Sequence, residues 1–115
     1  MITSQEDAAQ FREECLKWQK RLNLLHWTLT FKAEEKPDSD CEALCDYDCD
    51  TREAVLSYYI GVENVSHPKD NALHEMLHLL LADMNLAGVE ATDEEDRRLQ
   101  REEHKVIAIL EKVLR

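Results

Sequence analysis

Apolar residues near the start of the chain recur at spacings of three and four. This spacing places them on one face of an α-helix. Thr3 followed by Glu6 has the spacing of a capping box, in which two side chains bond backbone groups at a helix start. The pattern therefore predicts a first helix over residues 3–22. Its apolar stripe consists of Phe11, Cys15, Trp18, Leu22 and Leu25.

The middle of the chain changes to alternating apolar and polar residues, which is typical of half-buried β-strands. Trp27, Leu29 and Phe31 alternate with threonines in this way. A polar segment containing Pro37 follows and is interpreted as a loop, and Gly61 ends the alternation. The pattern predicts three short strands, over residues 25–31, 43–47 and 54–60.

Two further helices are predicted in the second half of the chain. The first begins between Ser66 and Asp70, because Pro68 suits a first helical turn and either polar residue could cap it. Gly88 is a natural C-terminal stop for this helix. Thr92 begins the last helix, since Glu95 completes a second capping box with it.

The order helix, three strands, helix, helix predicts an α+β fold with helices packed against a small sheet. The chain has 115 residues, of which 43% are hydrophobic. That length suits a single domain, residues 1–115, around one core. The apolar fraction is typical of globular proteins and argues against disorder.

The formal net charge is −11, from 25 acidic and 14 basic residues. This balance argues against a nucleic-acid partner, because phosphate binding depends on Lys and Arg. No apolar run approaches the ~20 residues that span a bilayer, so no membrane partner is expected. The first residues lack the basic start and apolar stretch of a signal peptide. A cytoplasmic protein is the simplest interpretation, and the sequence leaves its oligomeric state open.

Four cysteines are present, and in a cytoplasmic setting they are expected to be reduced. Cys15 lies on the stripe of the first helix and is interpreted as a core residue. Cys41, Cys45 and Cys49 repeat every four residues. On a strand, the first two would lie ~13 Å apart, too far to share a metal. A cysteine metal site is therefore the weaker hypothesis.

The segment His74-Glu75-Met76-Leu77-His78 carries the strongest chemical signal in the chain. Residues four apart on a helix point to nearly the same side, so two imidazoles at this spacing can bind one metal. The spacing is that of zinc peptidases, in which the Glu acts as general base. Both histidines lie at the edge of the predicted buried stripe and would face inward. That stripe consists of Leu73, Met76, Leu77, Leu80, Leu81 and Met84.

A catalytic zinc needs a third protein ligand. Glu102, Glu103 and His104 on the last helix are the candidates. Glu103 falls inside an apolar stripe, where a carboxylate is costly unless it is paired or bound to metal. Glu102 lies nearer the edge of the stripe and His104 points away from it. We therefore favour Glu103, followed by Glu102 and then His104. The stripe consists of Leu99, Val106, Ile107, Leu110, Val113 and Leu114.

Two histidines on one helix and a Glu on the next resemble the gluzincin pattern. The chain is similar to the small gluzincin-like zinc metallopeptidases (HExxH plus Glu) of phages and bacteria. The similarity covers the whole chain in outline and is most specific over residues 74–81 and 102–112. It implies a minimal zincin-like domain in which the HExxH helix is the active-site helix. It also implies catalysis through Glu75 and one zinc ion per chain, bound by His74, His78 and Glu103.

The chain departs from larger gluzincins in one position. Those proteins place an acidic residue one turn beyond the ligand Glu, where it orients a zinc-bound His. Here Ile107 occupies that place if Glu103 is the ligand, and Val106 if Glu102 is the ligand. The group that orients the histidines must come from elsewhere in the chain.

The expected function is a zinc-dependent metallohydrolase, and specifically a peptidase that uses a zinc-bound water activated by Glu75. A peptide or protein substrate could pair with an exposed strand edge. The alternative is a non-catalytic, zinc-stabilised protein-binding domain, but a purely structural site has no need of a base at Glu75. A donor for the developing oxyanion is also required. The sequence leaves five candidates open: Tyr58, Tyr59, His67, His26 and His104.

Overall fold

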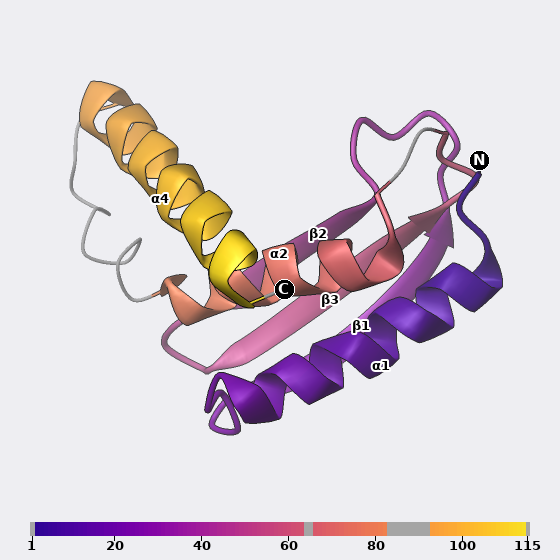
Figure 1. Ribbon diagram of the computed structural model, residues 1–115, viewed down its shortest axis with the longest axis horizontal. Helices are drawn as coiled ribbons and strands as arrows, with labels where there is room; N and C mark the ends of the chain where they lie inside the picture. Colours follow the sequence, from indigo (N-terminus) through magenta and orange to yellow (C-terminus); the bar gives the residue numbers. More distant parts are fainter. Residues whose placement is uncertain (1, 64–65, 83–92, 115) are drawn as a thin grey trace.

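The computed structural model describes residues 2–63, 66–82 and 93–114. It has an α+β fold in which helices pack against a small mixed sheet (Figure 1), which confirms the predicted class. The described residues follow the predicted order of helix, three strands, helix, helix. The elements are α1 (Gln5–Arg21), β1 (Thr28–Glu35), β2 (Ala43–Asp48), β3 (Glu53–Ile60), α2 (Pro68–Leu80) and α4 (Asp93–Leu114).

The sheet has three strands in the order β1-β3-β2, so the last strand in sequence is the central one. β1 runs parallel to β3 and begins by pairing Thr28 with Glu53. β2 runs antiparallel to β3 and pairs Ala43 with Tyr58. β2 is therefore an edge strand, and α2 packs beside it.

The first strand begins three residues later and ends four residues later than the alternation predicted. β1 covers Thr28–Glu35, whereas the sequence predicted a strand over residues 25–31 and a loop beyond it. The added residues pair with β3 as far as Ile60. Their side chains are exposed, and only the small Ala33 continues the apolar alternation. β2 and β3 lie within one residue of their predicted positions.

α1 and α2 lie side by side on one face of the sheet, and the core fills the space between them and the strands (Figure 1). Every second residue of β3 points into this core, as expected for a strand buried on one face. Cys15 is fully buried, as predicted from the stripe of the first helix. The core includes Phe11, Cys15, Trp18, Leu56, Tyr58, Leu73, Met76 and Leu77.

The start of α1 differs from the prediction by one residue. The capping box is formed by Ser4 and Asp7, not by Thr3 and Glu6. Thr3 is buried instead, and its hydroxyl donates a hydrogen bond of 2.7 Å to the carbonyl of Tyr59. The spacing predicted that the Thr3 side chain caps the helix, but the side chain forms this long-range hydrogen bond instead.

α2 begins at Pro68, inside the predicted window, but neither Ser66 nor Asp70 is its N-cap. His67 takes that position, and its Nδ1 accepts a hydrogen bond from the backbone N–H of Lys69. The helix ends at Leu80. Three predicted features of the following segment lie outside the described residues: Met84 in the stripe, the stop at Gly88 and the cap at Thr92.

α4 packs mainly on α2 (Figure 1). The predicted apolar stripe of this helix is only partly buried. Ile107 and Glu103 are 0% and 2% exposed, whereas Val106 and Val113 are 39% and 72% exposed. The buried line of α4 is therefore the one that contains Glu103 and Ile107, four residues apart.

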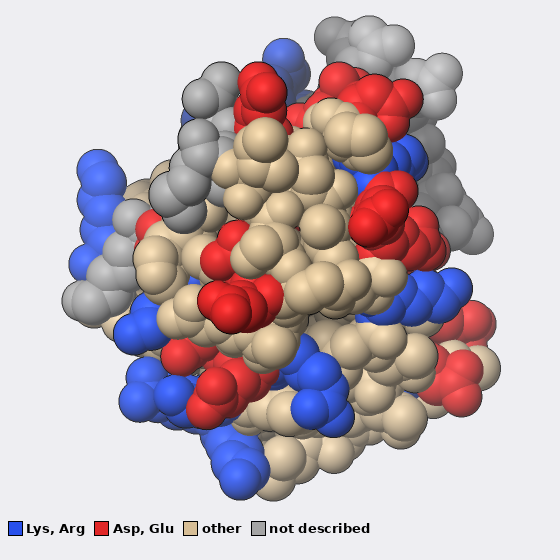
Figure 2. Space-filling model, turned by 90° about the vertical axis from the view of Figure 1, so that its right-hand side faces the viewer, with Lys and Arg blue, Asp and Glu red and all other residues tan. Residues whose placement is uncertain are grey.

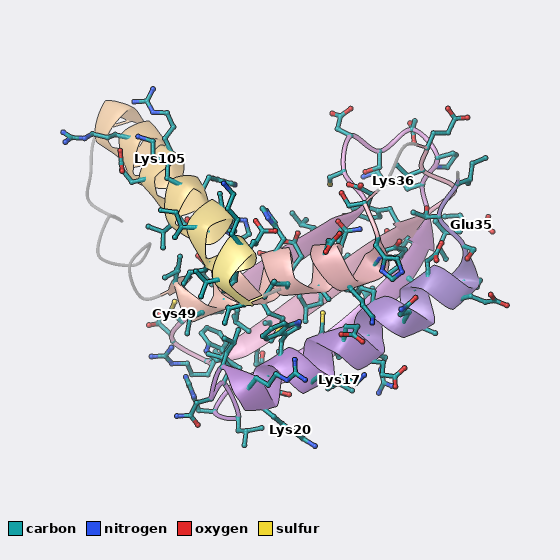
Figure 3. All side chains as sticks on the ribbon, in the orientation of Figure 1. Lys17, Lys20, Glu35, Lys36, Cys49 and Lys105 are labelled. Atoms are coloured by element: carbon teal, nitrogen blue, oxygen red, sulfur yellow. The ribbon has the colours of Figure 1, made fainter. Side chains whose placement is uncertain are left out.

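One face of the molecule carries charged side chains of both signs among uncharged ones (Figure 2). On the face in Figure 2, Asp and Glu side chains are interspersed with Lys and Arg. Lys17 and Lys20 lie on the side of α1 that faces away from the sheet (Figure 3). No helix in the described part of the chain is long and apolar enough to cross a membrane.

Candidate metal centre

α2 presents the two histidines and the glutamate of the HExxH segment at the boundary between core and solvent. Leu73, Met76 and Leu77 bury the inner side of the helix and fix its orientation. His74 and His78 lie one turn apart at the edge of this buried side and are half-buried. Their Nε2 atoms are 3.2 Å apart. The two imidazoles therefore converge, as the spacing predicted.

α4 adds a third histidine to this pair. The ring centroid of His104 lies 6.0 Å from that of His74 and 5.0 Å from that of His78. One ring nitrogen from each of the three residues lies within 4.8 Å of the other two. Three nitrogen donors this close together can hold one metal ion.

Two carboxylates of α4 contact the same histidines through their other ring nitrogens. Oε1 of Glu103 lies 2.9 Å from Nδ1 of His78, and Oε1 of Glu111 lies 3.4 Å from Nδ1 of His74. An ionised carboxylate only accepts hydrogen bonds, so both contacts are satisfied in the tautomer in which each Nδ1 donates its proton. Each Nε2 then keeps its lone pair. This is the usual arrangement behind metal-binding histidines.

The three candidates for the third ligand have different surroundings. Glu103 is buried as predicted, but its carboxylate contacts Nδ1 of His78 and lies outside the group of three histidines. Glu102 is largely exposed and pairs with Lys105 at 3.1 Å. His104, ranked last from the sequence, is exposed but joins the group. The arrangement thus favours His104 over Glu103 as third ligand.

Glu75 is, like Glu103, a buried carboxylate of the site, with only 8% of its surface exposed. Burial raises its pKa to about 8, partly opposed by a hydrogen bond from the backbone of Cys45 on β2. Glu42 and Glu111 raise the pKa further through charge repulsion. A carboxylate whose pKa lies near the operating pH can both accept and release a proton, as a general acid–base group requires.

The state of His78 also suits metal binding. Burial lowers the pKa of His78, whereas its hydrogen bond to Glu103 raises it and the neighbouring histidines lower it. A lowered pKa keeps the imidazole neutral near physiological pH. Only the neutral ring has a nitrogen lone pair free for a metal.

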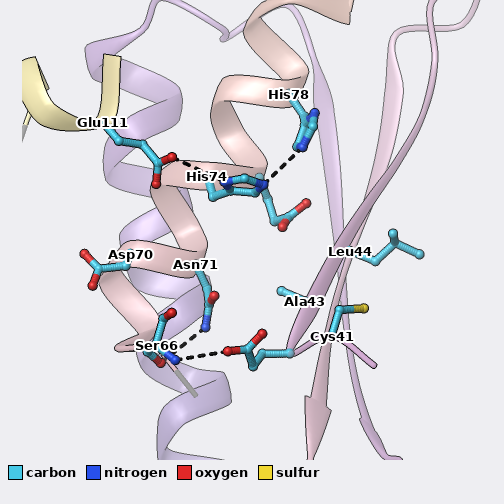
Figure 4. A pocket seen from close by; sticks show the side chains of 11 residues that line it. Cys41, Ala43, Leu44, Ser66, Asp70, Asn71, His74, His78 and Glu111 are labelled. Carbon is cyan, nitrogen blue, oxygen red and sulfur yellow. Dashed lines mark hydrogen bonds and ion pairs between the residues drawn. The ribbon is translucent and has the colours of Figure 1, made fainter. Parts of the chain in front are cut away.

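A pocket of about 390 Å³ lies between α2 and β2 and reaches the HExxH segment. Figure 4 shows His74 and His78 on one side of it and Ala43 and Leu44 of β2 on the other. Glu75 lines the same pocket. A substrate in this space would lie against the predicted base and two of the three histidines.

Of the five candidates for an oxyanion donor, only His104 lies in the metal-holding group. Tyr58 is buried in the core, and its hydroxyl has no hydrogen-bond partner among the described residues. His67 caps α2, and Tyr59 stacks with Lys36. His26 packs against a neighbouring indole ring.

The cysteines form no metal-holding group among the described residues. All four are free thiols. Burial raises the pKa of Cys45 to about 12, so this thiol is protonated in the metal-free protein.

Comparisons of the chain with protein-family models, with curated proteins and with solved structures give no match.

Zn²⁺ affinity should distinguish the three ligand candidates. We expect His104→Ala to weaken binding by more than the ~10–100-fold that loss of an outer hydrogen-bond partner costs. Glu103→Ala, which removes such a partner from His78, should fall within that range. Glu102→Ala is the matched control on the same helix and should bind as the wild type does. Competitive chelator titration measures all three. A larger loss in Glu103→Ala than in His104→Ala would restore Glu103 as the ligand.

Proposed function

We propose that the protein is a zinc-dependent metallohydrolase of the HExxH type, acting on peptides within a minimal zincin-like fold. One observation carries the proposal. Three histidines converge, and two of them line a pocket together with the buried carboxylate of Glu75 along an edge strand. A cluster of structural histidines would need neither the buried carboxylate nor the pocket.

The spacing of the donors supports zinc as the proposed metal, although imidazole also binds other transition metals. Zn–N distances of ~2.0–2.1 Å in a tetrahedral site place two nitrogen ligands ~3.3–3.4 Å apart. The Nε2 atoms of His74 and His78 are 3.2 Å apart. Three protein ligands with one open position are characteristic of catalytic zinc, whereas structural sites close with a fourth.

Each residue of the site has a defined role in the proposed reaction. A bound zinc ion would polarise the substrate carbonyl and make a water molecule more acidic. Glu75 accepts the proton of the attacking water and passes it to the leaving amine. Glu103 and Glu111 hold the protons on the Nδ1 atoms of His78 and His74. The core beneath α2 keeps these side chains in place.

The edge strand supports peptides as substrates. The backbone N–H of Tyr59 donates to the carbonyl of Glu42, which places Ala43 at a non-hydrogen-bonded position of the antiparallel pair. The N–H and carbonyl of such a residue point away from the neighbouring strand. Ala43 lines the pocket, so an extended peptide could bond its backbone there.

Digestion of a library of denatured proteins tests this function. We expect zinc-loaded protein to cleave peptide bonds, chelator-treated protein to cleave none, and added zinc to restore cleavage. Mass spectrometry of the products identifies the cleaved bonds. Cleavage that persists after complete removal of metal would rule out zinc dependence, and no cleavage by loaded protein would rule out the peptidase.

A further inference from the structure

The contacts between α2 and α4 follow an antiparallel order. His78 meets Glu103 near the C-terminal end of α2, and His74 meets Glu111 one turn earlier. The two carboxylates are eight residues apart on α4, with the buried Ile107 midway between them. At 3.6 residues per turn, positions four and eight residues apart follow one side of a helix. One line of α4 therefore supplies both carboxylates and the apolar contact between them.

We infer that Glu111 is a positioning residue that fixes the tautomer of His74, as Glu103 does for His78. A neutral imidazole carries its proton on one nitrogen and offers the other as acceptor or ligand. The Nε2 atoms of the two rings are 3.2 Å apart, within hydrogen-bond distance of each other. In the tautomer in which both rings donate Nδ1–H to a carboxylate, neither Nε2 carries a proton, and the two lone pairs face each other. Two facing lone pairs repel, and a cation placed between them removes the repulsion. α4 thereby prepares α2 to bind a metal.

The burial of the two carboxylates supports this role. The side chains of Glu103 and Glu111 are 2% and 16% exposed. Removing a carboxylate from water is costly unless hydrogen bonds or charge partners compensate. The donated Nδ1–H groups compensate part of this cost, and a metal on the far nitrogen makes each N–H a stronger donor. Glu111 also supplies the orienting carboxylate that the sequence lacks one turn beyond Glu103.

The first test measures the tautomer of His74 in metal-free protein, and it requires no enzymatic activity. In ¹⁵N spectra of the neutral imidazoles, we expect His74 of the wild type to carry its proton on Nδ1. Glu111→Ala should shift His74 toward the Nε2–H form, while His78 keeps its tautomer. Glu111→Gln, whose amide oxygen can still accept the bond, should restore the Nδ1–H form. Glu102→Ala is the control and should change neither ring.

Zn²⁺ affinity provides the second test and is the part that rests on the proposed function. We expect Glu111→Ala to bind Zn²⁺ ~10–100-fold more weakly than the wild type, with Glu111→Gln in between. Wild-type protein that binds no Zn²⁺ would overturn the proposed function and leave the tautomer result standing. An unchanged His74 tautomer in Glu111→Ala would overturn the role of Glu111 even if zinc binds and peptides are cleaved.

Discussion

Protein carrying His74→Ala together with His78→Ala is expected to retain no zinc, whereas wild-type protein should carry about one zinc per chain. The reason is that the two rings supply two of the three converging nitrogens, and the remaining His104 is exposed. A single exposed imidazole cannot hold zinc against a chelator. Metal analysis of the purified proteins after dialysis measures the stoichiometry.

A matched control replaces two histidines outside the site. His26 is exposed, and His67 caps α2 with its ring nitrogen. His26→Ala with His67→Asn removes the same number of imidazoles, and Asn preserves the cap. This control should keep its zinc. Full zinc retention by the His74/His78 double variant would place the metal elsewhere, for example on the cysteines.

The sequence predicted the elements of the fold well because each depends on a local pattern. The periodicity of Phe11, Cys15 and Trp18 marks the buried face of α1, and all three are core residues. The errors occur where tertiary contacts decide. Thr3 has the spacing of a cap, but its hydroxyl bonds a backbone carbonyl of β3 from 56 residues away. Leu25 continues the apolar stripe, yet it is 65% exposed because α1 ends at Arg21.

The residues of the candidate site also fall into those that a local pattern predicts and those that depend on tertiary contacts. The convergence of His74 and His78 follows from their spacing of four residues within one helix, and this spacing can be read directly from the sequence. The contribution of α4 depends on how two helices cross, which the sequence leaves undetermined. The apolar stripe correctly predicted that Glu103 is buried. Burial alone did not indicate whether the carboxylate faces a metal or the outer nitrogen of a histidine.

His104 and Glu111 show why burial was an incomplete guide. His104 is exposed and lies beside the buried line of α4, so it received the lowest rank from the stripe. A long side chain at the edge of a helix contact can still reach across it. The ring centroid of His104 lies 5.0 Å from that of His78. Glu111 lies eight residues beyond Glu103 on the same line. That spacing is the one signal in the sequence that could have identified it.

Glu75→Gln is expected to lower the rate of peptide cleavage by ~10²–10⁴-fold, the usual contribution of a general base, while zinc stays bound. Gln has nearly the same size but cannot accept the proton of the attacking water. The fold should tolerate the change. Burial raises the pKa of Glu75 from 4.5 to about 8, so the metal-free wild type loses stability as pH rises through that interval. Gln carries no charge and avoids this loss.

The measurement for Glu75→Gln combines single-turnover cleavage with metal analysis and thermal unfolding of the same preparation. Glu102→Gln is the matched control, because it removes an exposed carboxylate outside the pocket. It should cleave at the wild-type rate. Equal rates for Glu75→Gln and wild type would exclude Glu75 as the base. Loss of zinc in Glu75→Gln would instead show that this carboxylate holds the metal, because its neutral replacement leaves all three histidines in place.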